Sequence, residues 1–397
     1  MPTPIAQHSL PTDVTLTPAR AEIRVARLTP LDTLRGVIMI VMALDHANFF
    51  IAHQHPRPET WTGPLPYYDS ALAFFTRSVT HLAAPGFFFL MGAGMTLLAD
   101  SRRRLGWTRD AIVRHLIVRG LILIALQFLV EDPVWPLAST GRLIPPWSGG
   151  SIYFGVLYAL GGGMIVGALL LRLDSKWLIG ISAAAVLATQ VLFPDLVRSF
   201  VPLSPALHLL LVPGDTRNIS VLYPVIPWLS LMGFGLVFGR WLLEDRARAY
   251  RRALRIGIVF ILAFIVLRAW NGFGNIRPAE GPNWIDFLNV VKYPPSLVFI
   301  LLALGTDLIL LAGFARASYF LERWGQPLQV FGSSPLLFYI AHLYLYGVIG
   351  RTASPQGTSL AAMYPVWLLG LIILYPLCWA FGKFKRRQSP NSPWRFF

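Results

Sequence analysis

The stretch LDTLRGVIMIVMALDHANFF, residues 31–50, is long and apolar enough to cross a bilayer, yet it contains Arg35, Asp45 and His46. A charged side chain near the centre of a membrane helix costs roughly 2.5–3.5 kcal/mol on insertion scales, so such residues are usually functional. Arg35 and His46 are eleven positions apart, about 20° past three full turns. Both therefore lie on one face of the helix, roughly 16 Å apart along its axis.

The composition is that of an integral membrane protein. Of 397 residues, 55% are hydrophobic and 13% are charged, whereas a soluble domain has about 25% charged residues. The formal net charge is +15, but the basic residues form short clusters between apolar runs, where they act as topology signals. We therefore expect contact with membrane lipid and no nucleic-acid partner.

The apolar runs predict an all-α fold, a polytopic membrane helix bundle of about ten transmembrane helices. The expected spans are approximately 31–52, 78–99, 112–130, 150–171, 177–193, 222–242, 254–270, 294–313, 328–350 and 364–382. Residues 28–387 form one expected membrane domain between two cytoplasmic tails, 1–27 and 388–397. The first tail lacks an apolar signal-peptide core and is rich in Pro, Thr and Ala, so we expect it to be disordered and uncleaved.

The distribution of Lys and Arg predicts the orientation. Most of the 34 Lys and Arg residues lie in alternate connecting segments, together with the two tails. Since such residues concentrate on the cytoplasmic side, we expect both termini in the cytosol. The long loops 53–77, 131–149, 194–221 and 271–293 are then outside. In this orientation Arg35 lies near the cytoplasmic end of its helix, and His46 lies in the outward half.

Three histidines are candidates for chemistry. A neutral His46 imidazole can remove a proton from an amine or hydroxyl, and a nearby carboxylate such as Asp45 would raise its basicity. Adjacent helical residues point about 100° apart, however, so pairing of Asp45 with another helix is an alternative. His81 is expected at a depth similar to His46, and His342 lies among tyrosines in FGSSPLLFYIAHLYLYG. For each histidine, a structural role in packing or at the interface is the competing interpretation.

Other residues suggest less chemistry. His53 and His55 form an H-x-H pair without further obvious ligands, so a solvated loop is expected there and no metal site is predicted. Cys378 is the single cysteine, which excludes a disulfide within the chain. The chain has no G-x-S-x-G, Walker or G-x-G-x-x-G motif in a suitable context.

Several cations are candidates for binding the phosphates of a cytosolic donor. The cluster Arg102–Arg104 with Arg109 reads as a loop that touches anionic lipid. Arg114 and Arg119 lie deeper, in the third run, and fit phosphate binding better. Lys292, in LNVVKYPPSL, precedes a rigid helix start and is a further candidate.

The first helix resembles the signature of the transmembrane acyltransferase superfamily. Within residues 33–46, Arg35 is followed by ten residues and then by His46, in a helix that begins LDTLRG. That superfamily includes the acyltransferase-3 O-acetylases and the heparan-α-glucosaminide N-acetyltransferases. Further segments resemble the bacterial DUF1624-type branch of the latter, occur in family order and cover most of residues 28–382. They are MALDHANFF, THLAAPGFFFLMG, FGVLYALGGGMIVGALLLRL, YPVIPWLSLMGFGLVFGR, VKYPPSLVFILLALG and SPLLFYIAHLYLYG.

The resemblance implies ten or eleven helices in a bacterial inner membrane. It also implies transfer of an acyl group, typically acetyl, from cytosolic acyl-CoA to an amine or hydroxyl of a sugar or glycoconjugate on the far side. A homodimer is left open. In the eukaryotic heparan enzymes an asparagine stands at the position of His46, an aspartate at that of His81, and the catalytic histidine lies in the first luminal loop. His53 and His55 are out of register with it, so the heparan substrate is not carried over.

We therefore expect a membrane acyltransferase that uses acetyl-CoA. The expected catalytic residues are His46 as general base with Asp45, His81 and His342, and the expected donor-binding residues are Arg35, Arg114, Arg119 and Lys292. A transporter or flippase for a polar solute is the alternative, because it also needs buried charges. An inactive membrane scaffold is a third reading.

Overall fold

The computed structural model describes residues 28–148, 150–199, 203–389, 392 and 394. The predicted tail 1–27 lies outside the described residues, as does most of the predicted tail 388–397.

The described residues form a helix bundle, which confirms the predicted fold class. Nine helices among them are long and apolar enough to cross a membrane. These spans are α1 (Thr29–Ala47) with η1 (Asn48–Ala52), α2 (Ala71–Ser78) with η2 (Val79–Leu82) and α3 (Ala83–Arg104), α4 (Arg109–Leu126) with η3 (Gln127–Glu131) and η4 (Asp132–Val134), α7 (Ser175–Ser199), α9 (Val225–Glu244), α10 (Arg246–Trp270), α12 (Leu297–Arg316), α15 (Pro335–Ala353) and α16 (Leu360–Arg387).

Two of the ten predicted spans differ from expectation. The run 150–171 begins with strand β1 (Ile152–Phe154), and its helix α6 (Val156–Leu170) has 15 residues. At 1.5 Å per residue this helix is about 22 Å long, short of a hydrocarbon core of about 30 Å. The run 328–350 is divided at Ser334 into α14 (Gln326–Ser333) and α15, because Pro335 has no N–H to continue the first helix.

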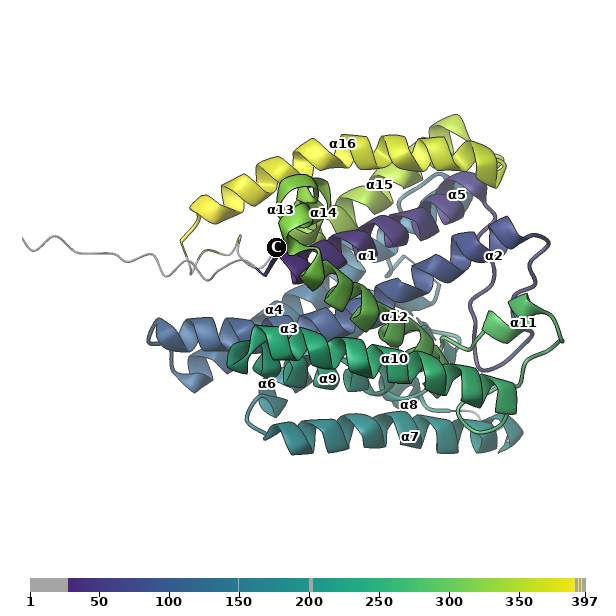
Figure 1. The fold of residues 1–397 in the computed structure, drawn as a ribbon. Coiled ribbons are helices and arrows are strands. Elements are labelled where there is room, and N and C mark those ends of the chain that lie inside the picture. The colour runs from purple at the N-terminus through teal and green to yellow at the C-terminus, as the bar shows by residue number, and fades with distance from the viewer. Residues whose placement is uncertain (1–27, 149, 200–202, 390–391, 393, 395–397) are drawn as a thin grey trace, which may run out of the picture.

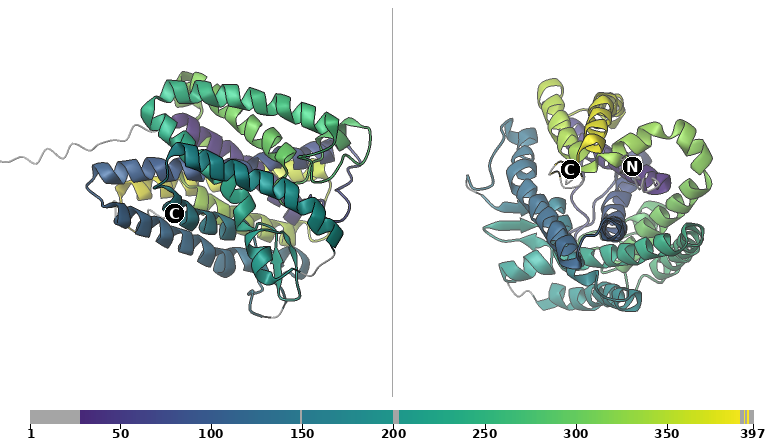
Figure 2. Two further views of the ribbon diagram at one scale, coloured as in Figure 1. Left: turned by 90° about the horizontal axis from the view of Figure 1, so that it is seen from below. Right: turned by 90° about the vertical axis from the view of Figure 1, so that its left-hand side faces the viewer.

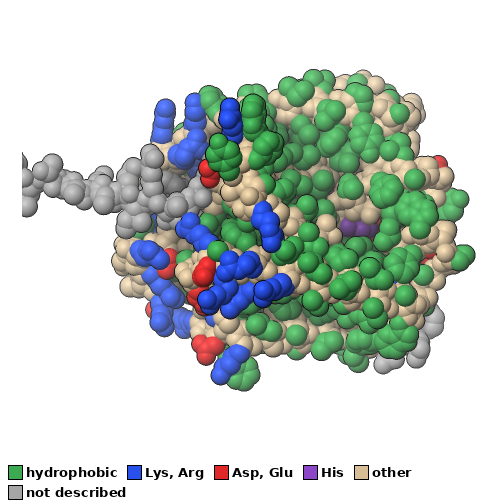
Figure 3. Space-filling model, in the orientation of Figure 1, with side chains coloured by type: hydrophobic (Ala, Val, Ile, Leu, Met, Phe, Trp, Pro, Cys, Tyr) green, Lys and Arg blue, Asp and Glu red, His purple; other side chains and the backbone are tan. Residues whose placement is uncertain are grey.

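The helices lie side by side along one axis, and Figure 2 shows them end-on in its right-hand view. Lys and Arg side chains gather at one end of the bundle, here called the basic end (Figure 3). The first described residues and the end of α16 both lie there (Figure 1). Apolar side chains cover the rest of the visible face, in keeping with a surface that meets lipid.

The opposite end, here called the outer end, is built from the long connections. It holds α2, α5 (Leu137–Thr140), α8 (Pro205–Leu210), α11 (Trp284–Leu288) and a small sheet. In that sheet β3 (Ile219–Val221) pairs in parallel with β1 and antiparallel with β2 (Gly214–Asp215). The sheet therefore ties the start of the predicted span 150–171 to the predicted outer loop 194–221.

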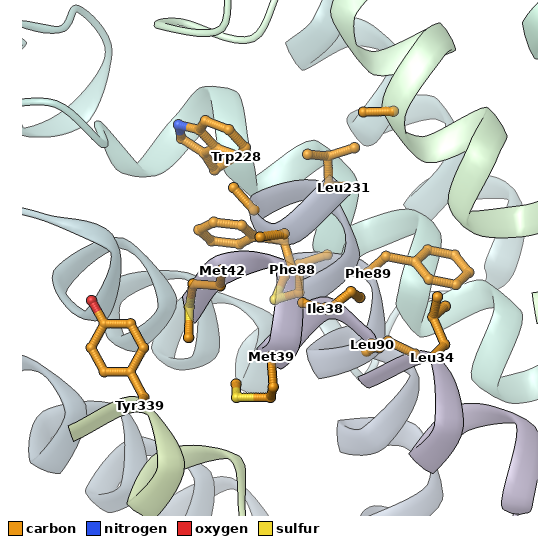
Figure 4. Packing of buried hydrophobic residues seen from close by; sticks show 14 of the residues in the cluster. Leu34, Ile38, Met39, Met42, Phe88, Phe89, Leu90, Trp228, Leu231 and Tyr339 are labelled. Carbon is orange, nitrogen blue, oxygen red and sulfur yellow. The ribbon is translucent and has the colours of Figure 1, made fainter. Parts of the chain in front are cut away.

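Helix α1 is the centre of the bundle, since it contacts α3, α12, α14, α15 and α16. Glycines allow its close crossing with α14. A Cβ atom on Gly36 would clash with the Leu328 carbonyl oxygen, and one on Gly332 would clash with the Asp32 carbonyl oxygen. Leu34 and Ile38 of α1 pack into the cluster of buried side chains shown in Figure 4. This packing fixes the rotation of α1, and with it the direction of the neighbouring face that carries Arg35 and His46.

Candidate functional site

Two cavities follow the Arg35–His46 face of α1. The outer cavity has a volume of about 660 Å³ and is lined by Met42 and His46, among other residues. The basic-end cavity has a volume of about 300 Å³ and is lined by Arg35 and Met39. The four side chains that helical periodicity places on one face thus occur in chain order along two successive cavities.

The two cavities adjoin at a common boundary. Phe87 of α3, Val156 of α6 and Tyr339 of α15 line both of them. We call these three residues the shared wall. A ligand in one cavity and a ligand in the other would approach each other at this wall.

His46 and His342 are brought together in the outer half of the bundle. His46 Nδ1 lies 2.7 Å from His342 Nε2, and the two rings stack with centroids 4.9 Å apart. His342 Nδ1 donates to the carbonyl oxygen of Phe338 at 2.8 Å, because a carbonyl can only accept. With both imidazoles neutral, His342 Nε2 must then accept from His46 Nδ1. His46 Nε2 keeps its lone pair, which is the form a general base requires.

Asp45 turns away from His46 and enters an ion cluster. Its carboxylate accepts two hydrogen bonds from Arg77 Nη1, both 2.8 Å, and lies 3.3 Å from His55 Nε2. The alternative that Asp45 pairs with another element is therefore the one observed. His55 is bound in this cluster and lines the outer cavity, so the expected solvated loop is wrong for His55, whereas His53 is exposed.

Arg77 also binds a second carboxylate, Glu59. Arg77 Nε and Nη2 donate to the two Glu59 oxygens at 2.8 and 2.6 Å, and His81 Nε2 lies 3.2 Å from Glu59 Oε1. Glu59 is 0% exposed and Arg77 is 1% exposed. Burial by itself would raise the pKa of Glu59, but the charges of Arg77 and His81 hold that pKa well below its usual value.

Sequence reasoning missed the role of Glu59 and Arg77. Arg77 sits in the apolar context LAFFTRSVTHL, which was a usable signal for a buried cation. Glu59 lies in a proline-rich loop, and no pattern in the sequence marks it as buried. His81 is held through Glu59 and is not hydrogen-bonded to His46 in the described part of the chain.

Lys292 lies in the outer cavity and not with Arg35. It is 3% exposed, and its ammonium lies 5.0 Å from the centre of the Tyr293 ring. Burial and, next to it, the charge of Arg77 lower the pKa of Lys292 to about 8. Asp45 and Glu59 oppose that shift in pKa.

The other wall of the outer cavity is acidic and aromatic. Glu131, Asp132, Trp135 and Tyr153 line it. Three buried atoms nearby have no hydrogen-bond partner among the described residues: Gln127 Nε2, Glu131 Oε2 and Trp135 Nε1. Gln127 and Glu131 belong to the π-helix η3, and π-turns are frequent at functional sites. These atoms are available to a polar ligand.

The basic-end cavity is lined by three cations, Arg35, Arg119 and Lys385. Within the described ranges, no Asp or Glu lines it. Arg35 Nη1 donates to the Gly332 carbonyl and to Asp32, whereas Arg119 Nε is buried without a partner in the described structure. Such a cavity suits an anion such as a phosphate. Arg114 is exposed and lines neither cavity.

The family model for the heparan-alpha-glucosaminide N-acetyltransferase catalytic domain matches residues 27–266, more than half of the chain. The match and the apolar helices point to the class of transmembrane acetyltransferases. The chain belongs to the heparan-alpha-glucosaminide N-acetyltransferase catalytic family, which confirms the resemblance seen in the sequence. Lys292, Tyr339 and His342 lie beyond the matched residues. A comparison with curated proteins found no match.

The buried ion cluster gives a testable prediction for stability. Glu59→Gln removes one of the two carboxylates that pair with the fully buried Arg77, so we expect a loss of about 3–5 kcal/mol in the free energy of unfolding. Asp100→Asn is the matched control, because its pair with Arg104 is exposed and should contribute at most about 1 kcal/mol. Unfolding of the purified proteins in detergent measures both.

The ion pair between Glu59 and Arg77 also predicts how the free energy of unfolding changes with pH. Since the folded-state pKa of Glu59 is lowered, its stabilisation is present above the unfolded-state pKa. That stabilisation is lost as the pH falls through the folded-state pKa. Equal stability of Glu59→Gln and wild type across this range would contradict the assignment.

Proposed function

We propose that the protein transfers an acyl group, most simply acetyl, from cytosolic acyl-CoA to an amine or hydroxyl of a sugar or glycoconjugate on the far side of the membrane. The observation that carries this proposal is the pair of cavities on one face of α1, which adjoin at the shared wall. One cavity is lined by cations, and the other is lined by His46, which is hydrogen-bonded to His342. Residues 28–387 act as one catalytic domain.

The basic-end cavity is the donor site in this proposal. Arg35, Arg119 and Lys385 would hold the phosphates of the donor, and Arg119 Nε, buried without a partner in the described chain, fits that task. The thioester would extend past Met39 toward the shared wall. The basic end and both chain termini then face the cytosol, in the inner membrane of a bacterium, as the Lys and Arg bias predicts.

The outer cavity is the acceptor site. His46 Nε2 takes the proton from the acceptor as its nitrogen or oxygen bonds to the carbonyl carbon of the thioester. The carbon–sulfur bond then breaks, and His46 returns the proton to the leaving thiolate. His342 holds His46 in the required tautomer. Asp45 and His81 act at a distance, through the ion cluster that closes this end of the bundle.

A transporter for a polar solute is the second candidate. The observation that favours it is the same one, since cavities on opposite sides of a barrier are also what alternating access requires. The two functions differ in one measurable respect: a transferase consumes acetyl-CoA and releases CoA thiol in proportion to acceptor, whereas a transporter releases none.

The donor site predicts unequal effects for two arginines of α4. Arg119→Ala should weaken acetyl-CoA binding about 10- to 100-fold, because a charge-assisted hydrogen bond contributes about 1.5–3 kcal/mol. Arg114→Ala is the matched control and should bind like wild type, since Arg114 is exposed outside both cavities. Calorimetric titration of the purified proteins with acetyl-CoA measures both. Equal losses in the two variants, or no loss in Arg119→Ala, would refute this donor site.

The base assignment predicts a loss of rate without a loss of donor affinity. His46→Ala should lower acetyl transfer by about 10²–10⁴-fold, the usual contribution of a general base. Acetyl-CoA affinity should be nearly unchanged, because His46 does not line the basic-end cavity. Transfer from radiolabelled acetyl-CoA to a panel of amino sugars and glycosides measures the rate.

Three further variants locate the base. His53→Ala is the control, because His53 is exposed. His46→Asn mimics the residue of the eukaryotic relatives. Full activity of His46→Asn together with loss of activity in His55→Ala would place the base in the outer loop and overturn the role of His46.

A further inference from the structure

The shared wall contains a single side chain that can form hydrogen bonds. Phe87 and Val156 have no polar side-chain atoms, whereas Tyr339 has a hydroxyl group. Among the described residues, Tyr339 is therefore the one residue that lines both cavities and has a side chain able to form hydrogen bonds. Figure 4 shows Tyr339 at the edge of the packed cluster, with its oxygen pointing away from the cluster.

Tyr339 is positioned beside the histidine pair. Its ring centre lies 6.4 Å from that of His46 and 5.7 Å from that of His342, with interplanar angles of 81° and 73°. Tyr339 and His342 are three residues apart on α15, so they share a face of that helix. Tyr339 is 5% exposed, so packing holds its ring in place. The proposed base and the phenol thus border the same small volume.

We propose that the Tyr339 hydroxyl stabilises the oxyanion that forms on the thioester carbonyl during transfer. This inference rests on the proposed acyltransferase function and adds a catalytic residue to it. As the acceptor bonds to the carbonyl carbon, the carbonyl oxygen becomes negative and Tyr339 Oη donates a hydrogen bond to it. The charge returns to the carbon–oxygen double bond when the carbon–sulfur bond breaks. Tyr339 keeps its own proton, since His46 carries the acceptor proton to the thiolate.

The position of the wall explains why this hydroxyl and not another is used. The thioester comes from the basic-end cavity and the acceptor from the outer cavity, so the reacting carbonyl lies where the two adjoin. A donor fixed in a water-poor site before the reaction stabilises developing charge more than water does. Removal of one such donor typically costs about 10²–10³-fold in kcat.

Glu131 interacts with Tyr339, so in this proposal the protonation state of Glu131 decides which way the phenol proton points. In its acid form the Glu131 carboxyl donates to Tyr339 Oη and leaves the phenol proton for the carbonyl oxygen. An ionised Glu131 carboxylate would instead accept a hydrogen bond from the Tyr339 hydroxyl, and the phenol proton would then point away from the carbonyl oxygen. A glutamine at this position reproduces the acid form, because its amide also donates.

The test compares two ligands on two phenylalanine variants. Tyr339→Phe removes the hydroxyl. Tyr344→Phe is the matched control, five residues further along α15: the Tyr344 hydroxyl donates to the Val130 carbonyl at 2.8 Å, and Tyr344 lines neither cavity. The ligands are acetyl-CoA and its trifluoroacetonyl analogue, whose ketone hydrates to a tetrahedral form resembling the intermediate. Calorimetry on the full-length protein in detergent gives both affinities.

We expect Tyr339→Phe to weaken binding of the trifluoroacetonyl analogue at least about tenfold, whereas the affinity for acetyl-CoA should change less than about threefold. Its kcat should fall about 10²-fold with little change in KM. Tyr344→Phe should alter neither ligand, and Glu131→Gln should retain the tight binding of the analogue.

Three results would overturn the inference. Equal weakening of both ligands by Tyr339→Phe would assign Tyr339 a structural role. Loss of analogue binding in Glu131→Gln would mean that the phenol proton is directed to the carboxylate. Failure of the wild-type protein to bind either ligand would refute the proposed donor class itself, and with it the oxyanion role.

Discussion

The buried Arg77 guanidinium, held between Asp45 and Glu59, is the interaction on which the outer half of the structure depends. A charge inside a membrane protein is stable only if it is paired, and here one cation pairs with two carboxylates from different segments. The cluster ties the first outer loop to α1 and to the start of the second span. It also takes Asp45 away from His46. His46 is therefore free to bond to His342 and to present its other nitrogen to the outer cavity.

In the proposed function, the arrangement separates donor binding from chemistry along one helix face. Arg35 lies at one cavity and His46 at the other, and a single wall stands between them. Glycines at the crossing of α1 and α14 bring the two backbones close enough to keep this face in register with its neighbours. Donor and acceptor would thus reach one reacting point from opposite ends, without either having to cross the bilayer.

The sequence predicted the bundle, its basic end and the common face of Arg35 and His46, because hydropathy and helical periodicity depend only on local spacing. It could not show which helix lies opposite a given side chain. The partner of Asp45, the burial of His55 and the position of Lys292 in the outer cavity depend on how long loops fold back. The run 150–171 was predicted too long for the same reason, since its first residues form strand β1 and pair with a distant strand.

Vectorial transfer is the most direct test of the central claim. The protein is reconstituted into proteoliposomes in one orientation, fixed by a tag at the end of α16 on the basic end. Acetyl-CoA is supplied outside or inside, and an amino-sugar acceptor is confined to one compartment. Acetylated product is expected only when acetyl-CoA is at the basic end and the acceptor is on the opposite side. Efficient transfer with both substrates confined to the same side would contradict it.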